Sequence, residues 1–156
     1  MRRTALQSAG KLDPAYHFML DHHLWIRVAQ LGKILHVNQT WSAARYHAEA
    51  KNVAKAAEFG RDAFRILEAA AQDGNLAPIL AKINRRARAS ANRVDARYLL
   101  DGGQLASALS AWMRALLLHP PTALARLNLL ASAILNLIGL GNVRLAILRK
   151  RESRFK

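Results

Sequence analysis

Residues 94–121 read VDARYLLDGGQLASALSAWMRALLLHPP, and this stretch decides the fold of the larger part of the chain. Apolar residues recur at helical spacing on both sides of Asp101-Gly102-Gly103, which has the composition of a turn. The pattern predicts one helix over Val94–Leu100 and a second over Leu105–Leu118, which Pro120-Pro121 ends. Two helices joined by so short a turn are expected to pack antiparallel.

This helix pair, at about 94–120, resembles one tetratricopeptide unit, a repeat of ~34 residues. The matching positions are Ala96, Leu99, Gly103, Ala108, Trp112, Ala115 and Pro120. The sequence holds no second copy, and stacking into a binding superhelix needs about three repeats. The pattern therefore favours a plain helix pair that packs against its neighbours. A tetratricopeptide-like interaction protein is a less favoured hypothesis, because the sequence holds a single unit.

The rest of residues 53–156 predicts further amphipathic helices, about five in all. Apolar residues at helical spacing predict a helix from Val53 to the turn at Asp73-Gly74-Asn75, with Asp62 and Arg65 paired on its solvent-exposed side. The other expected helices cover about 76–88, with arginines outside, about 122–138, and a short basic segment after Gly141.

Composition excludes several classes of protein. With 52% hydrophobic residues among 156, the chain is too apolar for wholesale disorder. It has no cysteine, which excludes a disulfide scaffold, a thiolate zinc site and a cysteine nucleophile. The formal charge of +14 favours anionic partners such as nucleic acid, a membrane leaflet or phosphorylated molecules. The charge is concentrated only in the basic tail, Arg149–Lys156.

Residues 1–52 have a different sequence pattern, with helix, turn and strand signals mixed. This pattern predicts an α/β fragment too small to close its own sheet. The expected elements are a helix over Arg3–Ala9 stopped by Gly10, a turn at Leu12-Asp13-Pro14, a helix over Phe18–Leu31, and strands at Ile34–Val37 and Thr40–Tyr46. The predicted fold class is thus mostly α (α+β), an α/β edge followed by an all-helical tail.

The densest group of chemically capable residues lies in this first part. Asp21 stands at a helix start, where the partial positive charge favours a carboxylate and its use as a base, although for a lone aspartate a helix N-cap is the favoured explanation. His22 and His23 are adjacent and point about 100° apart on a helix, so they cannot form the metal pair of zinc hydrolases. Arg45 and His47 share one face of a strand, which suits a phosphate or a hydrated cation, or a solvated strand edge.

Four segments in order resemble the closing third of the catalytic domain of inverting, family 2 glycosyltransferases, which have the GT-A fold. They are residues 2–14 (RRTALQSAGKLDP), 20–27 (LDHHLWIR), 32–37 (GKILHV) and 44–47 (ARYH). The resemblance implies that residues 1–52 are the C-terminal part of a GT-A domain. The helical remainder, 53–156, is similar to the tails of some bacterial members.

The resemblance also implies roles for individual residues. Asp21 takes the position of the catalytic base, and His47 that of a residue near a metal-bound diphosphate, with Mn or Mg as the divalent cation. The residues implied to bind substrate are His22, His23, Trp25 and Arg45. Leu20 and His23 replace acidic residues of the family pattern, which implies an altered choice of acceptor.

The sequence contains no Asp-x-Asp, the motif with which the family's donor-binding half holds its metal. We therefore expect a truncated product, a mis-called start or a split gene, and a chain that is inactive alone. A full-length enzyme would use a nucleotide-sugar donor and a saccharide or lipid-linked acceptor.

Two further predictions concern the cellular location of the protein and an alternative to sugar transfer. No signal pattern follows Met1, which predicts a cytoplasmic protein. The uncharged stretch Leu127–Val143 favours a buried or interfacial helix, so that this helix and the basic tail could contact the anionic inner membrane face. The alternative is a non-enzymatic basic helical module for nucleic acid or a protein partner. Its arginines at 85–97 lack interleaved aromatics, which disfavours nucleic acid.

Overall fold

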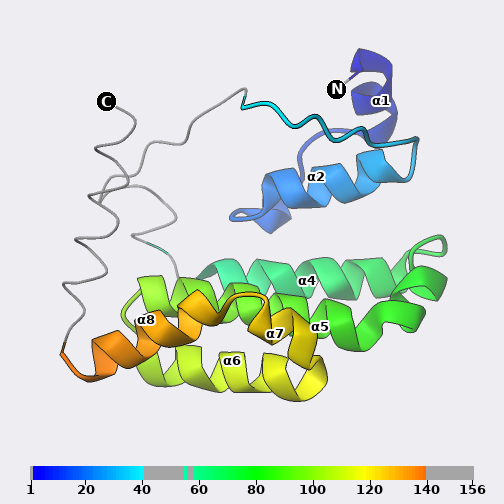
Figure 1. The fold of residues 1–156 in the computed structure, drawn as a ribbon. Coiled ribbons are helices and arrows are strands. Elements are labelled where there is room, and N and C mark those ends of the chain that lie inside the picture. The colour runs from blue at the N-terminus through cyan, green and yellow to red at the C-terminus, as the bar shows by residue number, and fades with distance from the viewer. Residues whose placement is uncertain (1, 41–54, 56–57, 140–156) are drawn as a thin grey trace.

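The structure, a computed structural model, describes residues 2–40, 55 and 58–139, and its regular elements there are helices (Figure 1). They are α1 (Arg3–Ala9), the 3-10 turn η1 (Pro14–Tyr16), α2 (Leu20–Ala29), α4 (Phe59–Gln72), α5 (Ala77–Asp101), α6 (Leu105–Leu118), α7 (Pro120–Leu124) and α8 (Leu127–Leu137). The prediction of a mostly α protein is confirmed.

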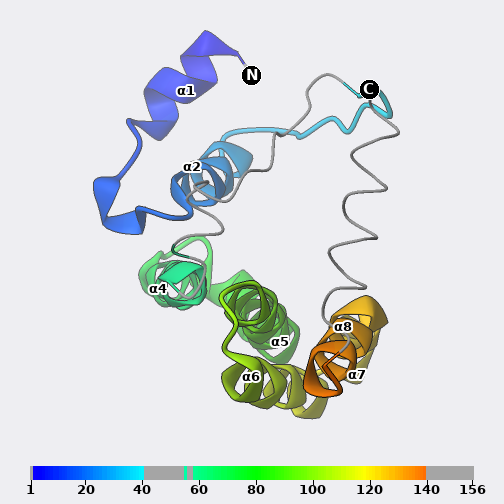
Figure 2. The ribbon, with the colours of Figure 1, turned by 90° about the vertical axis from the view of Figure 1, so that its left-hand side faces the viewer.

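The tail is built around α5, which packs against α4 on one side and α6 on the other. Figure 2 shows this arrangement end-on, with α2 on the side of α4 that faces away from α6. Helices α7 and α8 cover α5 and α6 at the edge away from α4. The antiparallel pairing predicted on both sides of the Asp101-Gly102-Gly103 turn is therefore confirmed.

Local sequence signals explain where the N-terminal helices begin and end. Helix α1 stops at Gly10, whose φ of 80° is in the left-handed region that favours glycine. Asp13 begins η1, because its Oδ1 accepts a hydrogen bond from the backbone N–H of Ala15 at 3.0 Å. Helix α1 has the predicted bounds, and α2 is two residues shorter than predicted at each end.

Two predicted helix boundaries in the tail are wrong. The helices expected over 76–88 and 94–100 are one continuous helix, α5, because the residues between them, ASANR at 89–93, include neither glycine nor proline to stop it. The single helix expected over 122–138 is two, α7 and α8, which meet at Ala125 and Arg126. A backbone hydrogen bond from Arg126 to Ala123 closes the turn, and no side chain there explains the break.

The strand predicted at Ile34–Val37 is also wrong. Among the described residues the segment 33–38 pairs with no neighbour, and a strand requires a partner for its backbone N–H and C=O groups. Ile34 and Leu35 are 73% and 85% exposed. The rest of Thr40–Tyr46, the predicted helix start at Val53 and the basic segment after Gly141 lie outside the described residues.

The buried residues form two clusters. One lies between α5, α6, α7 and α8 and centres on Trp112, which is 6% exposed. The other lies between α4, α5 and the chain before α2, and includes Met19, Ile66 and Phe59. The Phe59 ring stacks on Tyr98 with centroids 4.2 Å apart. The second cluster thus joins the N-terminal part to the helical tail.

Asp62 strengthens this junction, contrary to its predicted place on the solvent-exposed side of the helix. It is only 2% exposed, and its Oδ2 accepts a hydrogen bond from the backbone N–H of Phe18 at 2.8 Å. The predicted pair with Arg65 does form, at 3.5 Å. Arg65 also donates to the carbonyl oxygen of Ala15 at 3.2 Å, so one turn of α4 holds the segment that leads into α2.

Gly60 of α4 lies directly against Asp95 of α5, and this contact yields a first prediction. A Cβ at this position would overlap the carboxyl group of Asp95 on α5. We expect Gly60→Ala to lower the free energy of unfolding by about 1–3 kcal/mol, measured by urea denaturation, because the Asp95 side chain or one of the two helices must shift.

Gly74→Ala is the matched control, since nothing lies within 4 Å of a Cβ placed there. Adding Asp95→Ala to Gly60→Ala should recover much of the loss. Equal stability of the two alanine variants would contradict the close approach.

Candidate functional site

The Asp21 carboxylate lies in the first turn of α2 and is 61% exposed. Its Oδ1 accepts hydrogen bonds from the backbone N–H of His22 at 2.9 Å and from the His22 ring at 3.1 Å. Its other oxygen, Oδ2, bonds to no residue within the described ranges. The N-cap of α2 is Met19, so Asp21 is not the helix cap that the sequence also allowed.

Two neighbours extend this exposed surface along α2. Trp25 lies one turn after Asp21 and is 55% exposed. The rings of His22 and Trp25 are 5.6 Å apart and tilted by 39°. The structure therefore groups three of the residues that the sequence nominated, a carboxylate, an imidazole and an indole, on one accessible face.

His23 lies apart from this group. Its ring stacks on Tyr16 of η1 with centroids 3.8 Å apart, and its buried Nδ1 has no hydrogen-bond partner among the described residues. Burial lowers the pKa of His23 below its ordinary value, and Arg27 adds to this effect, whereas Asp13 opposes it. His23 thus holds η1 against α2 as a neutral side chain.

Arg27 is a residue of this region that the sequence analysis did not single out. Its Nη1 donates to the carbonyl oxygen of Ala9 at 2.8 Å, and its Nη2 donates to that of Lys11 at 2.6 Å. These carbonyls flank Gly10, where α1 has ended and leaves acceptors unpaired. Arg27 thereby fixes α1 against α2, and a basic residue opposite a helix end is the signal that could have indicated this.

The lowered pKa of His23 gives a second prediction. The pKa of His23 is lower in the folded state than the unfolded value of about 6.5. The stability that depends on neutral His23 is therefore fully present above pH ~6.5, and it is lost as the pH falls through the folded-state pKa. We expect the free energy of unfolding to fall between pH 7.5 and pH 5. In His23→Phe, which keeps a ring against Tyr16, the free energy of unfolding should fall less over the same pH range.

His36→Phe is the control, an identical change at an exposed histidine. Identical pH profiles for wild type and His23→Phe would contradict a role for this imidazole.

Arg45 and His47, nominated for substrate and metal, lie outside the described residues. Within the described ranges, no three histidine, aspartate or glutamate side chains come together as a metal site. Within the described residues, the structure thus shows no ready-made group of ligands for a divalent cation.

Several tail arginines bind neighbouring helices. Arg85 Nε donates to the carbonyl oxygen of Leu118 at 3.1 Å, at the end of α6. Arg93 Nη1 donates to that of Thr122 in α7 at 3.2 Å, and Arg114 Nε on α6 donates to Asn92 Oδ1 at 3.1 Å. These side chains join α5 to its neighbours, so part of their hydrogen-bonding capacity is taken up within the fold.

No helix in the described part of the chain has both the length and the apolar character needed to cross a membrane. No family model matches the chain, and neither does any curated protein or solved structure in the comparisons. Function is therefore inferred from α2 and the elements that hold it.

Proposed function

We propose that the chain is the C-terminal part of an inverting family 2 glycosyltransferase, which transfers a sugar from a nucleotide-sugar donor to a cell-surface saccharide or lipid-linked acceptor. The observation that carries the proposal is the Asp21 carboxylate. It is exposed in the first turn of α2 and keeps one oxygen without a partner in the described part of the chain. Trp25, one turn later, offers a flat apolar ring beside it.

The proposed reaction uses Asp21 as general base. Its free oxygen removes the proton of an acceptor hydroxyl as that oxygen attacks the anomeric carbon of the donor. The bond from that carbon to the diphosphate breaks, the nucleoside diphosphate leaves with the electron pair, and the configuration inverts. The bonds to His22 fix Oδ1, which leaves Oδ2 to face the acceptor.

The extended segment 33–38 supports the view that residues 1–52 belong to a larger α/β domain. Ile34 and Leu35 are adjacent in sequence and therefore point to opposite sides of an extended chain, and both are strongly exposed. Apolar residues on both sides are typical of a strand buried within a parallel sheet. Polypeptide beyond residues 1–52 would supply that sheet.

Donor binding is proposed to need that additional polypeptide, so the chain alone should be inactive. The cation, Mn or Mg, and the nucleotide would be held largely there. The enzyme is proposed to be cytoplasmic, with residues 127–156 in peripheral contact with the anionic inner membrane face. The alternative, a basic module for nucleic acid or a protein partner, draws on the +14 charge, although Arg85 and Arg93 donate within the fold.

Calorimetric titration with UDP and GDP plus manganese gives a third prediction. The chain alone should bind neither nucleotide, because no Asp-x-Asp is present in the sequence. A micromolar dissociation constant would show that no further donor-binding half is needed.

The function itself is tested by fusing the chain to the coding sequence directly upstream of it in the genome. The fusion should contain an Asp-x-Asp and should transfer sugar from UDP- or GDP-sugars. A fusion without that motif and without transfer would overturn the proposal, and tight binding of duplex or single-stranded oligonucleotides by the chain would favour the alternative.

A further inference from the structure

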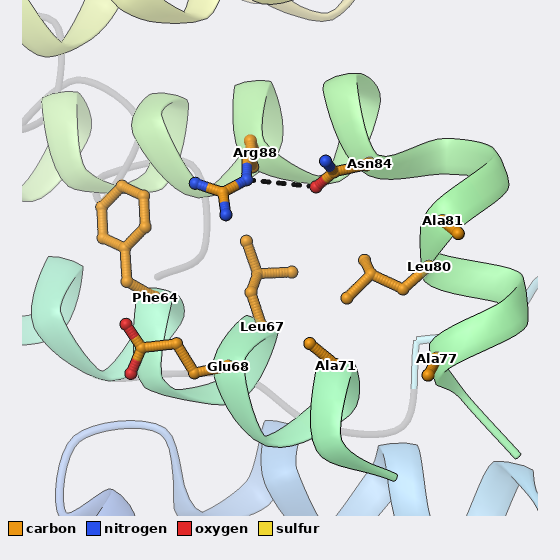
Figure 3. Close-up of a pocket in the computed structure, with 9 residues that line it drawn as sticks. All are labelled: Phe64, Leu67, Glu68, Ala71, Ala77, Leu80, Ala81, Asn84 and Arg88. Atoms are coloured by element: carbon orange, nitrogen blue, oxygen red, sulfur yellow. Dashed lines mark hydrogen bonds between the residues drawn. The ribbon is translucent and has the colours of Figure 1, made fainter. Parts of the chain in front are cut away.

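A groove of about 280 Å³ lies between α4 and α5 (Figure 3). Its floor is apolar, and Figure 3 shows Leu67 of α4 and Leu80 of α5 pointing toward each other across it, with Phe64 beside Leu67. Two charged side chains complete the lining, Arg88 from α5 and Glu68 from α4. An apolar trough with a few polar groups at its wall is the usual form of a small-molecule site.

Arg88 is held in position at this groove. Its Nε donates to Asn84 Oδ1, one turn earlier on α5, at 3.1 Å. Its two terminal nitrogens make no hydrogen bond to a residue in the described ranges, and no ion pair joins Arg88 to Glu68 there. A guanidinium oriented through Nε with both ends open is suited to receive a carboxylate or a phosphate in two-point contact.

The charge around the groove favours an anion. Helix α5 carries Lys82, Arg85, Arg86, Arg88 and Arg93 between residues 77 and 94, with no acidic residue in that range. Of these, Arg85 and Arg93 donate to α6 and α7, and Arg88 is the base that lines the groove. Glu68 is the one acid of the groove lining. The local field is thus positive on the α5 wall, where the oriented guanidinium lies.

We propose that this groove binds one molecule of a single-chain amphipathic anion, with its alkyl chain between Leu67 and Leu80 and its phosphate or carboxylate on Arg88. The volume lies just below the ~300–1,000 Å³ of typical ligand sites, which suits one short chain. The ligand is therefore a free monomeric amphiphile, and a bilayer surface is not the partner. This site is separate from Asp21 and does not depend on the proposed sugar transfer.

The test is calorimetric titration of the whole chain with decyl phosphate, below the concentration at which it forms micelles. Decyl phosphate should bind with one-to-one stoichiometry. Inorganic phosphate and decyltrimethylammonium should each bind at least about tenfold more weakly than decyl phosphate. Inorganic phosphate lacks the alkyl chain, and decyltrimethylammonium lacks the anionic group.

Three variants locate the site. Arg88→Gln should weaken decyl phosphate binding about tenfold, whereas Arg86→Gln, an equal loss of charge at an exposed residue outside the groove, should have little effect. Glu68→Gln should strengthen binding by removing repulsion. Ala71→Leu, which fills the groove without changing charge, should weaken it.

Equal effects of Arg88→Gln and Arg86→Gln would overturn the proposal, because they would show attraction to net charge alone. Binding of decyltrimethylammonium as tight as that of decyl phosphate would do the same. Binding of the chain to anionic vesicles without saturable binding of monomeric decyl phosphate would also overturn the proposal. It would show that the basic side chains of α5 bind a membrane surface instead. Melting temperatures of all variants separate loss of the site from loss of the fold.

Discussion

Asp21→Asn should lower the turnover of the proposed glycosyltransferase, completed with a donor-binding half, by about 10²–10⁴-fold, the usual contribution of a general base. The amide keeps the size of the carboxylate and an oxygen for the His22 backbone N–H, which Asp21 now binds at 2.9 Å. It cannot take a proton from the acceptor hydroxyl. Steady-state rates with saturating donor and acceptor measure the effect.

Donor affinity and melting temperature should change little in the same variant, because Asp21 is exposed and Met19 occupies the helix cap. Glu58→Gln, an equal change at an exposed acid of the tail, should leave turnover unchanged. Near-normal turnover of Asp21→Asn would remove the catalytic assignment. A loss of turnover that follows melting temperature would show a structural role instead.

Trp112→Ala should lower the free energy of unfolding by about 3–5 kcal/mol, the range for removing a large aromatic side chain from a packed core. The indole is 6% exposed and lies in the cluster between α5, α6, α7 and α8. Three alanines and three leucines line the space beside it: Ala96, Ala108, Ala133, Leu100, Leu109 and Leu130. The alanines cannot extend into the cavity that the variant leaves, so only a shift of the leucines could reduce the loss.

Trp25→Ala is the matched control, an identical change at a 55% exposed residue, and it should cost well under 1 kcal/mol. Urea denaturation followed by far-UV circular dichroism measures both variants. A Trp112→Ala protein as stable as Trp25→Ala would show that the cluster around Trp112 is not a packed core.

Elements with their own start and stop signals could be predicted from the sequence. Helix α1 ends at Gly10, which takes the left-handed conformation there, and α6 ends before the prolines that begin α7. The absence of a signal led to errors elsewhere. Residues 89–93 were expected to separate two helices, yet α5 continues through them, and Ala89, Ala91 and Asn92 are buried between its neighbours.

Other features depend on contacts that local sequence does not contain. Asp62 has the spacing of a surface ion-pair residue, and its burial comes from the amide of Phe18, 44 positions away. Ile34–Val37 has strand composition, but strand formation requires a partner.

In the candidate site, the helix start predicted the position of Asp21. The positions of His23 and Arg27 depend on η1 and the end of α1, which fold against α2.

The pairing of each tail helix with the next along the chain has a kinetic consequence. Helices α4, α5 and α6 are joined by connections of a few residues, so little loop-closure entropy is lost when they meet. Domains dominated by such local contacts fold in microseconds to milliseconds. The Asp62–Phe18 bond spans a much longer loop, so the N-terminal part should dock last, onto a tail that has already formed.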